Sequence, residues 1–152
     1  MNRKIIALFI LSSTLFFADR ITKQYALAQY QDPVHITSFL TYTTHLNTGM
    51  AFSLFHAESL LGLLAILTLI FLVMCYFIRY AYQQWKKTQN IPWGCALVIT
   101  GALSNVCDRV MYGGVVDFIL LHYHEYAWPI FNLADMFICL GIALLFLNRE
   151  CL

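Results

Sequence analysis

The chain has 152 residues, of which 61% are hydrophobic and only 11% are charged. Soluble domains usually contain about 25% charged residues, and a small domain exposes much of its surface to water. The composition therefore excludes an ordinary soluble domain and favours a bilayer as the natural solvent, and the net charge of +1 gives no support for nucleic-acid binding.

The first apolar segment runs from about Ile5 into the Leu-Ala-Gln-Tyr sequence that ends at Tyr30, and Asp19 and Arg20 interrupt it. Its basic start is typical of a signal peptide, but no small-x-small cleavage site precedes the charged residues. The sequence therefore predicts a retained transmembrane helix.

A long segment outside the spans follows, from about residue 29 to residue 57. Its Thr, Tyr, Phe and Ile residues occur at the short spacing that favours β-strands, and Asn47-Thr48-Gly49 is typical of a turn or bulge. We expect a small β-rich cradle on the membrane surface.

Three more apolar segments have about the 17–25 residues that cross a hydrocarbon core as a helix. They are Ser59–Tyr80, Pro92–Tyr112 and Asn132–Leu147, with approximate bounds. We therefore expect an all-α membrane protein with four transmembrane helices, forming a single domain over residues 1–152. A second loop, from about Gly113 to Phe131, connects the last two spans, and Gly113-Gly114 indicates a hinge in it.

The basic residues predict the orientation, because they favour the cytoplasmic side of a membrane. Six of the nine basic residues lie before the first span, between the second and third, and after the fourth: Arg3, Lys4, Arg79, Lys86, Lys87 and Arg149. Both termini are therefore expected on the cytoplasmic side. Every acidic residue except Glu150, and all five His, are expected on the opposite side.

Polar residues in or beside the spans are expected to gather at one membrane face, opposite the cytoplasmic side, and such residues often mark a functional site. They are Asp19, Lys23, Asn105, Asp108, Arg109, Asp117, Asn132 and Asp135. Asp19 and Lys23 share a helix face. They could form an interfacial ion pair in which the lysine snorkels towards water, or they could shape a site.

The third span places Asn105, Asp108 and Arg109 on one face by their spacing of three and four residues. Asp108 and Arg109 could neutralise each other as a structural clamp. Alternatively, the planar fork of Arg109 could hold a carbonyl or carboxylate of a substrate.

Asn132 and Asp135 could simply begin the fourth helix, as a cap and as a charge favoured by the helix dipole. That interpretation leaves Asp117 unexplained, because it lies in the apolar sequence VVDFILL without a basic neighbour. Two unpaired carboxylates near one interface suggest a dyad that shares a proton, with one general base and one general acid. This is the chemistry of aspartic peptidases.

Other chemistries have weaker signals in this sequence. His122 and His124 are two residues apart with one Glu nearby, which is a weak pattern for a metal site. No serine-nucleophile, zinc-peptidase or phosphate-loop motif is present. We therefore predict neither a metal nor a cofactor.

Four blocks resemble the lipoprotein signal peptidase (signal peptidase II) family, in the family's order and spacing. They are Asp19–Lys23, Asn47–Phe52, Asn105–Phe118 and Phe131–Asp135. The resemblance implies that Asp117 and Asp135 are the catalytic dyad, near the periplasmic face of the inner membrane. Ser104 departs from the family's usual Gly, and we expect it to tighten packing without threatening activity.

The resemblance also implies the substrate. This is a prolipoprotein whose Cys carries diacylglyceryl, cleaved just before that Cys by a monomeric enzyme in contact with membrane lipid. Asn47 and Gly49 would close over the peptide, since Gly allows close backbone approach. The alternatives are a small transporter or proton relay, which favours polar residues at every membrane depth, and a structural subunit, which gives no reason for four polar blocks.

Overall fold

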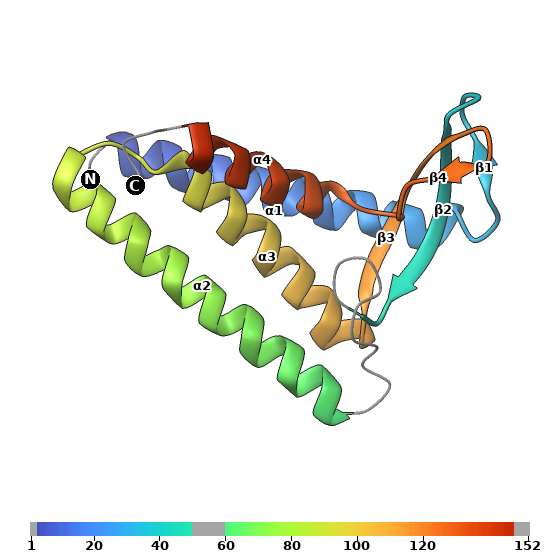
Figure 1. The fold of residues 1–152 in the computed structure, drawn as a ribbon, viewed down its shortest axis with the longest axis horizontal. Coiled ribbons are helices and arrows are strands. Elements are labelled where there is room, and N and C mark those ends of the chain that lie inside the picture. Colours follow the sequence, from blue (N-terminus) through green and yellow to red (C-terminus); the bar gives the residue numbers. More distant parts are fainter. Residues whose placement is uncertain (1–2, 50–59, 148–152) are drawn as a thin grey trace.

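The computed structural model describes residues 3–49 and 60–147, which form four helices and four strands. In chain order these are α1 (Arg3–Gln29), β1 (Val34–His35), β2 (Leu40–Asn47), α2 (Leu60–Thr88), α3 (Trp93–Tyr112), β3 (Val115–Tyr123), β4 (Tyr126–Ala127) and α4 (Leu133–Leu147). The helices lie along one another, and the sheet projects from one end of them (Figure 1). Arg149 and Met50–Phe52, which entered the sequence predictions, lie outside the described residues.

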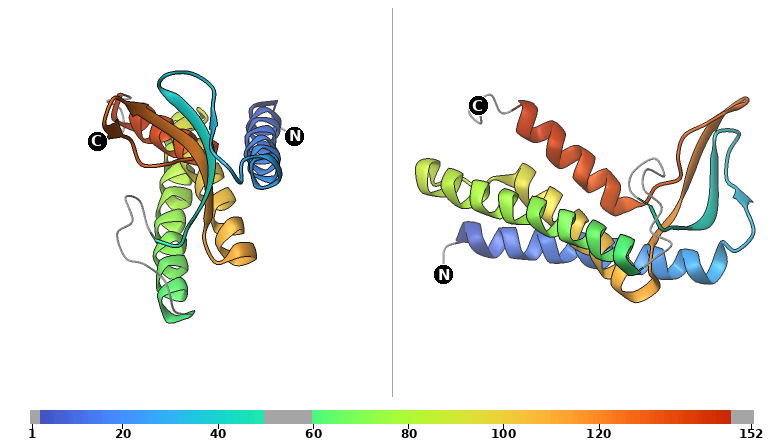
Figure 2. Two further views of the ribbon diagram at one scale, coloured as in Figure 1. Left: turned by 90° about the vertical axis from the view of Figure 1, so that its right-hand side faces the viewer. Right: turned by 60° about the horizontal axis from the view of Figure 1, so that its bottom comes forward.

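The end of the molecule opposite the sheet brings together the start of α1, the α2–α3 connection and the end of α4 (Figures 1 and 2). Two of these segments carry described basic residues. The Lys4 ammonium donates a 2.8 Å hydrogen bond to the carbonyl of Gln89, which follows α2. Lys86 and Lys87 lie in the last turn of α2. The described basic segments are therefore grouped as the predicted orientation requires.

Helices α1 and α2 are long and apolar enough to cross a membrane, with 27 and 29 residues. Helix α2 has a single buried side chain, that of Ile66. Large apolar side chains such as Phe71 and Leu72 are exposed on its surface. An apolar surface of this extent suits contact with lipid.

Helix α3 is the centre of the bundle, because it packs against α1, α2, α4 and β3. Its contact with α4 is close: a Cβ added at Gly101 would collide with the Ala134 carbonyl oxygen and lie 2.8 Å from Cγ1 of Ile138. Small residues at such a contact let two helix backbones approach each other, as in membrane helix pairs. The residues that follow Gly101 on α3 are thereby held against the start of α4.

The sheet has the order β1-β2-β3-β4, and every neighbouring pair is antiparallel. Asn47 is the partner of Val115, and His45 is the partner of Asp117. The longest strand of the sheet, β3, therefore lies in residues 113–131, the segment that the sequence analysis predicted to be a loop. The prediction missed this strand because residues 115–118 are all buried, which removes the polar–apolar alternation of a half-exposed strand.

Gly113 ends α3 and begins the turn into β3. Its φ of 76° is left-handed, and its N–H donates to the Arg109 carbonyl at 3.0 Å. Glycine adopts this conformation without steric cost, so it is the usual residue after a helix C-terminus. The residue predicted as a hinge therefore serves as a helix cap that directs the chain into β3.

Candidate active site

Asp117 lies in the buried first half of β3, where the strand passes the start of α4. Only 2% of the residue is exposed. Asn47, from the adjacent strand β2, donates its side-chain amide to Oδ2 at 3.0 Å, and Asn132 donates to Oδ1 at 2.5 Å. Both carboxylate oxygens thus have an amide donor, which partly offsets the cost of burying the group.

Asp135 lies in the first turn of α4 and is held from two sides. Asn105 of α3 donates to its Oδ1 at 2.9 Å. The backbone N–H of Asn132 donates to Oδ2 at 3.2 Å, while the Asn132 side-chain oxygen accepts from the Asp135 N–H at 3.0 Å. This is the reciprocal arrangement of a capping box.

Asn132 therefore fulfils both interpretations that the sequence left open. Its side-chain oxygen caps α4, and its side-chain nitrogen donates to Asp117. One fully buried asparagine contacts both aspartates.

The two aspartates line one cavity of about 410 Å³. The other polar side chains in its lining are those of Asn47, Asn105 and Arg109, and the remainder is Val115, Trp128, Pro129, Ile130, Phe131, Met136, Ile138 and Cys139. Burial, together with the neighbouring Asp135 carboxylate, raises the pKa of Asp117 from 3.8 to about 7, against the opposing effect of its amide donors. An aspartate in this environment retains a proton near neutral pH, as one member of an acid–base pair must.

Arg109 reaches the cavity from α3 and is only 8% exposed. One terminal nitrogen donates to the Gly49 carbonyl at 3.0 Å, and Nε has no hydrogen-bond partner within residues 3–49 and 60–147. Arg109 does not form the predicted clamp with Asp108, because neighbouring residues on a helix point about 100° apart. Asp108 instead pairs with Arg20 and Lys23 of α1.

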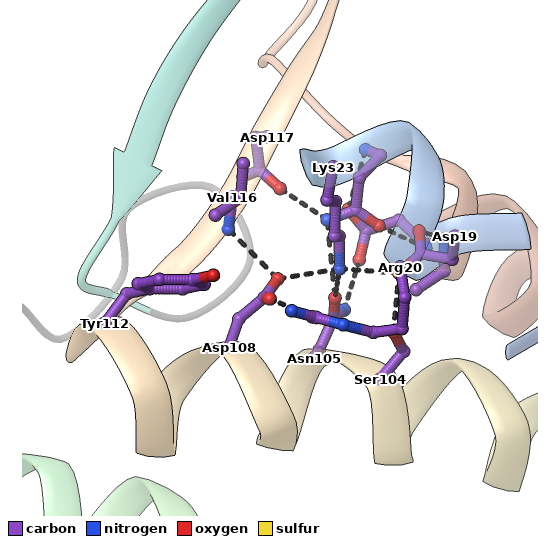
Figure 3. A network of polar contacts seen from close by, with 12 residues as sticks. Asp19, Arg20, Lys23, Ser104, Asn105, Asp108, Tyr112, Val116 and Asp117 are labelled. Atoms are coloured by element: carbon purple, nitrogen blue, oxygen red, sulfur yellow. Dashed lines mark hydrogen bonds and ion pairs between the residues drawn. The ribbon is translucent and has the colours of Figure 1, made fainter. Parts of the chain in front are cut away.

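A second polar cluster lies beside the cavity, between α1 and α3 (Figure 3). Lys23 is its centre, with Nζ 2.8 Å from Asp19, 2.8 Å from Asp108 and 2.8 Å from the side-chain oxygen of Asn105. Lys23, Asp19 and Asp108 are fully buried. Of the two interpretations left open, the ion pair of Lys23 with Asp19 is present, but the lysine does not snorkel towards water. The lysine has no contact with water because α3 packs over it, and Asp108 and Asn105 of α3 accept its hydrogen bonds.

Two members of this cluster were missed from the sequence. Arg20 pairs with Asp108, although in the chain it adjoins Asp19. Ser104 donates its hydroxyl to Oδ2 of Asp19 at 2.6 Å, so it forms a hydrogen bond where tighter packing was expected. The spacing of four between Ser104 and Asp108, on the face already assigned to the site, was the available signal.

His122 lies apart from both clusters. Its Nε2 is 3.0 Å from the hydroxyl of Thr41, which also contacts His35. Within the described residues, no three His, Cys, Asp or Glu side chains are arranged to hold a metal ion.

Two solved structures share the fold, and both are bacterial membrane enzymes determined by the in meso method. One, at 2.3 Å resolution, is 27% identical with a TM-score of 0.74, covering 97% of this chain and 90% of its own. The other, at 1.9 Å, is 28% identical with a TM-score of 0.71, covering 96% and 95%. The fold and the apolar helices therefore define a membrane-embedded enzyme.

The family model of signal peptidase (SPase) II matches residues 11–149. The lipoprotein signal peptidase of Teredinibacter turnerae is 41% identical over 134 residues, which are 84% of this chain and 77% of the relative. That of Clostridium novyi is 36% identical over 138 residues, covering 87% and 90%. The chain belongs to the signal peptidase II family, and the predicted class of aspartic peptidase is confirmed.

Proposed function

We propose that the chain removes signal peptides from prolipoproteins in the cavity between β3 and α4, with Asp117 and Asp135 as the catalytic dyad. The observation that carries the proposal is that Asn132 contacts both carboxylates and that both line one cavity. Membership of the family supports the reaction, and the geometry of the cavity supports this choice of residues.

In this mechanism the dyad holds one proton. The ionised carboxylate accepts a proton from water, which attacks the carbonyl of the scissile peptide bond. The protonated carboxyl donates its proton to the leaving amine. The raised pKa of Asp117 fits a group that begins the reaction protonated.

Arg109 binds the substrate backbone in this proposal. Its Nε–H has no partner among the described residues, and its guanidinium lines the cavity. A carbonyl oxygen of the bound peptide would accept from it and complete its hydrogen bonding. Asn47 and Gly49 also contact the proposed site. Asn47 donates to Asp117, and the Gly49 carbonyl accepts from Arg109.

The apolar part of the cavity supports recognition of a diacylglyceryl group on the substrate Cys, with cleavage just before that residue. The wall from Trp128 to Phe131, continued by Met136 and Ile138, offers few groups that could read a peptide sequence. Burying an acyl chain contributes about 0.8 kcal/mol per CH₂. The lipid would then place the peptide bond beside the dyad at a fixed depth.

We also propose that all four helices span the inner membrane, as one domain over residues 1–152 with the sheet and site at the periplasmic face. The grouping of Lys4 with the end of α2, opposite the sheet, supports this. Both aspartates come from one chain, so a monomer suffices.

Tags at either terminus should resist protease added outside spheroplasts, and a tag at Gln31 should be cleaved. A cleaved C-terminal tag would contradict four spans.

Purified enzyme acting on one prolipoprotein, with and without its diacylglyceryl group, tests the function. The lipidated form should be cleaved and the unlipidated form should be cut poorly or not at all. Asp117→Asn and Asp135→Asn should each lower turnover by roughly 10²–10⁴-fold, because each removes a general acid or base.

Asp32→Asn is the matched control, since Asp32 is an exposed carboxylate on the connection between α1 and β1. It should cleave at the wild-type rate. Full activity in either dyad variant would contradict the assignment. Equal rates on the two substrate forms would show that the peptide alone is recognised. Proton flux without cleavage would favour a proton relay.

A further inference from the structure

Two buried carboxylates outside the cavity hold the backbone beside the proposed dyad. Oδ1 of Asp19 accepts the N–H of Ala134 at 2.8 Å, and Oδ2 of Asp108 accepts the N–H of Val116 at 3.2 Å. Ala134 and Val116 are the residues immediately before the two dyad aspartates. The backbone next to each dyad aspartate is thus held by a carboxylate from another helix: Asp19 of α1 holds α4, and Asp108 of α3 holds β3.

The hydrogen bond from Ala134 is one that α4 cannot make by itself. The first N–H groups of a helix have no acceptor within the helix. Asn132 satisfies the N–H of Asp135, and Asp19 reaches across from α1 to satisfy that of Ala134. A carboxylate at this end is also favoured by the helix dipole. Asp19 therefore fixes where α4 begins relative to α1.

Lys23 joins the two carboxylates. Its ammonium lies 2.8 Å from Oδ2 of Asp19 and 2.8 Å from Oδ2 of Asp108. Its third contact, also 2.8 Å, is to Asn105, whose amide donates to Asp135. An ammonium has three protons, and three acceptors surround it (Figure 3). Lys23 does not line the cavity.

We propose that Lys23 is a positioning residue that sets the separation of the two catalytic carboxylates by joining the buried acids that hold β3 and α4. The proposal rests on the assignment of Asp117 and Asp135 as the dyad. Lys23 acts through Asp19, Asp108 and Asn105, and it touches no substrate. Its loss should therefore change turnover and leave substrate binding unaltered.

Lys23→Arg is the sharpest variant, because it keeps the charge and changes only the geometry. A planar guanidinium cannot direct donors at three acceptors arranged around one nitrogen. We expect kcat to fall at least about tenfold, since a displacement of about 1 Å can lower a rate by roughly 10²-fold. KM for the lipidated prolipoprotein should stay within about twofold, because the cavity lining is unchanged.

Lys87→Arg is the matched control. Lys87 is an exposed lysine in the last turn of α2, outside the cluster that holds the dyad, so the variant makes the same charge-conserving exchange away from the proposed site. Its kcat should remain within about twofold of the wild-type value.

Hydrogen exchange gives a readout that is independent of activity. The amides of Val116 and Ala134 should exchange faster in Lys23→Arg than in the wild type, and at the wild-type rate in Lys87→Arg. If Lys23→Arg does not fold, Asp19→Asn serves in its place. An Asn oxygen can still accept from Ala134, but its amide would face the ammonium of Lys23, so kcat should again fall at constant KM.

The outcomes separate this inference from the proposed function. Wild-type kcat in the folded Lys23 or Asp19 variant, alongside an inactive Asp117→Asn, would overturn the positioning role and leave the dyad in place. A raised KM with unchanged kcat would overturn it as well, because Lys23 would then act in binding. An active Asp117→Asn would overturn the proposed function, and the inference would fall with it.

Discussion

Helices α2 and α3 differ in the kind of side chains that they bury and expose. Helix α2 has 29 residues and one buried side chain, and its apolar length alone qualifies it as a membrane span. Helix α3 has 20 residues, does not qualify by hydropathy, and buries five polar side chains: Thr100, Ser104, Asn105, Asp108 and Arg109. Helix α3, which supports the proposed dyad through Asn105, therefore resembles a span less than α2 does, because its polar side chains face other protein groups while α2 exposes apolar side chains.

Titration should distinguish the two regions most strongly. The pKa of Asp117 is raised in the folded protein from 3.8 to about 7, so the folded state binds its proton more tightly than the unfolded state does. Stability is therefore lost as the pH rises through this window. Asp117→Asn does not titrate, so its stability relative to wild type should increase between pH 4 and pH 7 by on the order of 4 kcal/mol.

Thermal unfolding in detergent across this pH range measures the effect. Leu72→Ala on α2 is the comparison, because α2 contains no Asp, Glu or His and the side chain is exposed. Its stability relative to wild type should not vary with pH. A constant difference between Asp117→Asn and wild type would show that Asp117 is ionised across the whole range.

Added volume should also affect the two helices differently. In Gly101→Ala the new Cβ would meet the Ala134 backbone, which cannot move aside as a flexible side chain could. We expect a loss of about 1–3 kcal/mol, the usual cost of overpacking, together with reduced cleavage, because Ala134 adjoins Asp135. Ala65→Val on the exposed surface of α2 should change stability by less than about 0.5 kcal/mol. Equal melting temperatures for the two variants would contradict the close α3–α4 contact.

The smallest predicted difference concerns two hydroxyl groups. Ser104→Ala removes a buried hydrogen bond to Asp19, and Thr68→Val removes an exposed one to the Leu64 carbonyl within α2. We expect about 1 kcal/mol for the first, and a few tenths at most for the second. Both variants should still cleave prolipoprotein. Loss of cleavage in Ser104→Ala would show that the serine hydroxyl is required for activity.

The sequence was sufficient to predict the four helices and to single out Asp117 and Asp135, which line one cavity, because these predictions depend on apolar length and on isolated charges. It could not reveal which groups join them. Lys23 and Asn105 are 82 residues apart, and nothing local indicates that α1 and α3 place them within a hydrogen bond. The acid beside Arg109 in the chain is bound by Arg20 for the same reason. These partners are set by how the helices pack, and the packing of helices cannot be read directly from one sequence.

The double use of Asn132 links the maturation of the protein to its activity. Its oxygen begins α4 and its nitrogen holds Asp117, so the first turn of the last helix and the reactive pair form together. A chain made from its N-terminus inserts α1, α2 and α3 before α4 exists. Until α4 docks, Asp117 lacks both its proposed partner Asp135 and one of its two amide donors. On the proposed assignment, a chain whose last helix has not yet docked would be inert, and incompletely folded molecules would cleave no membrane substrate.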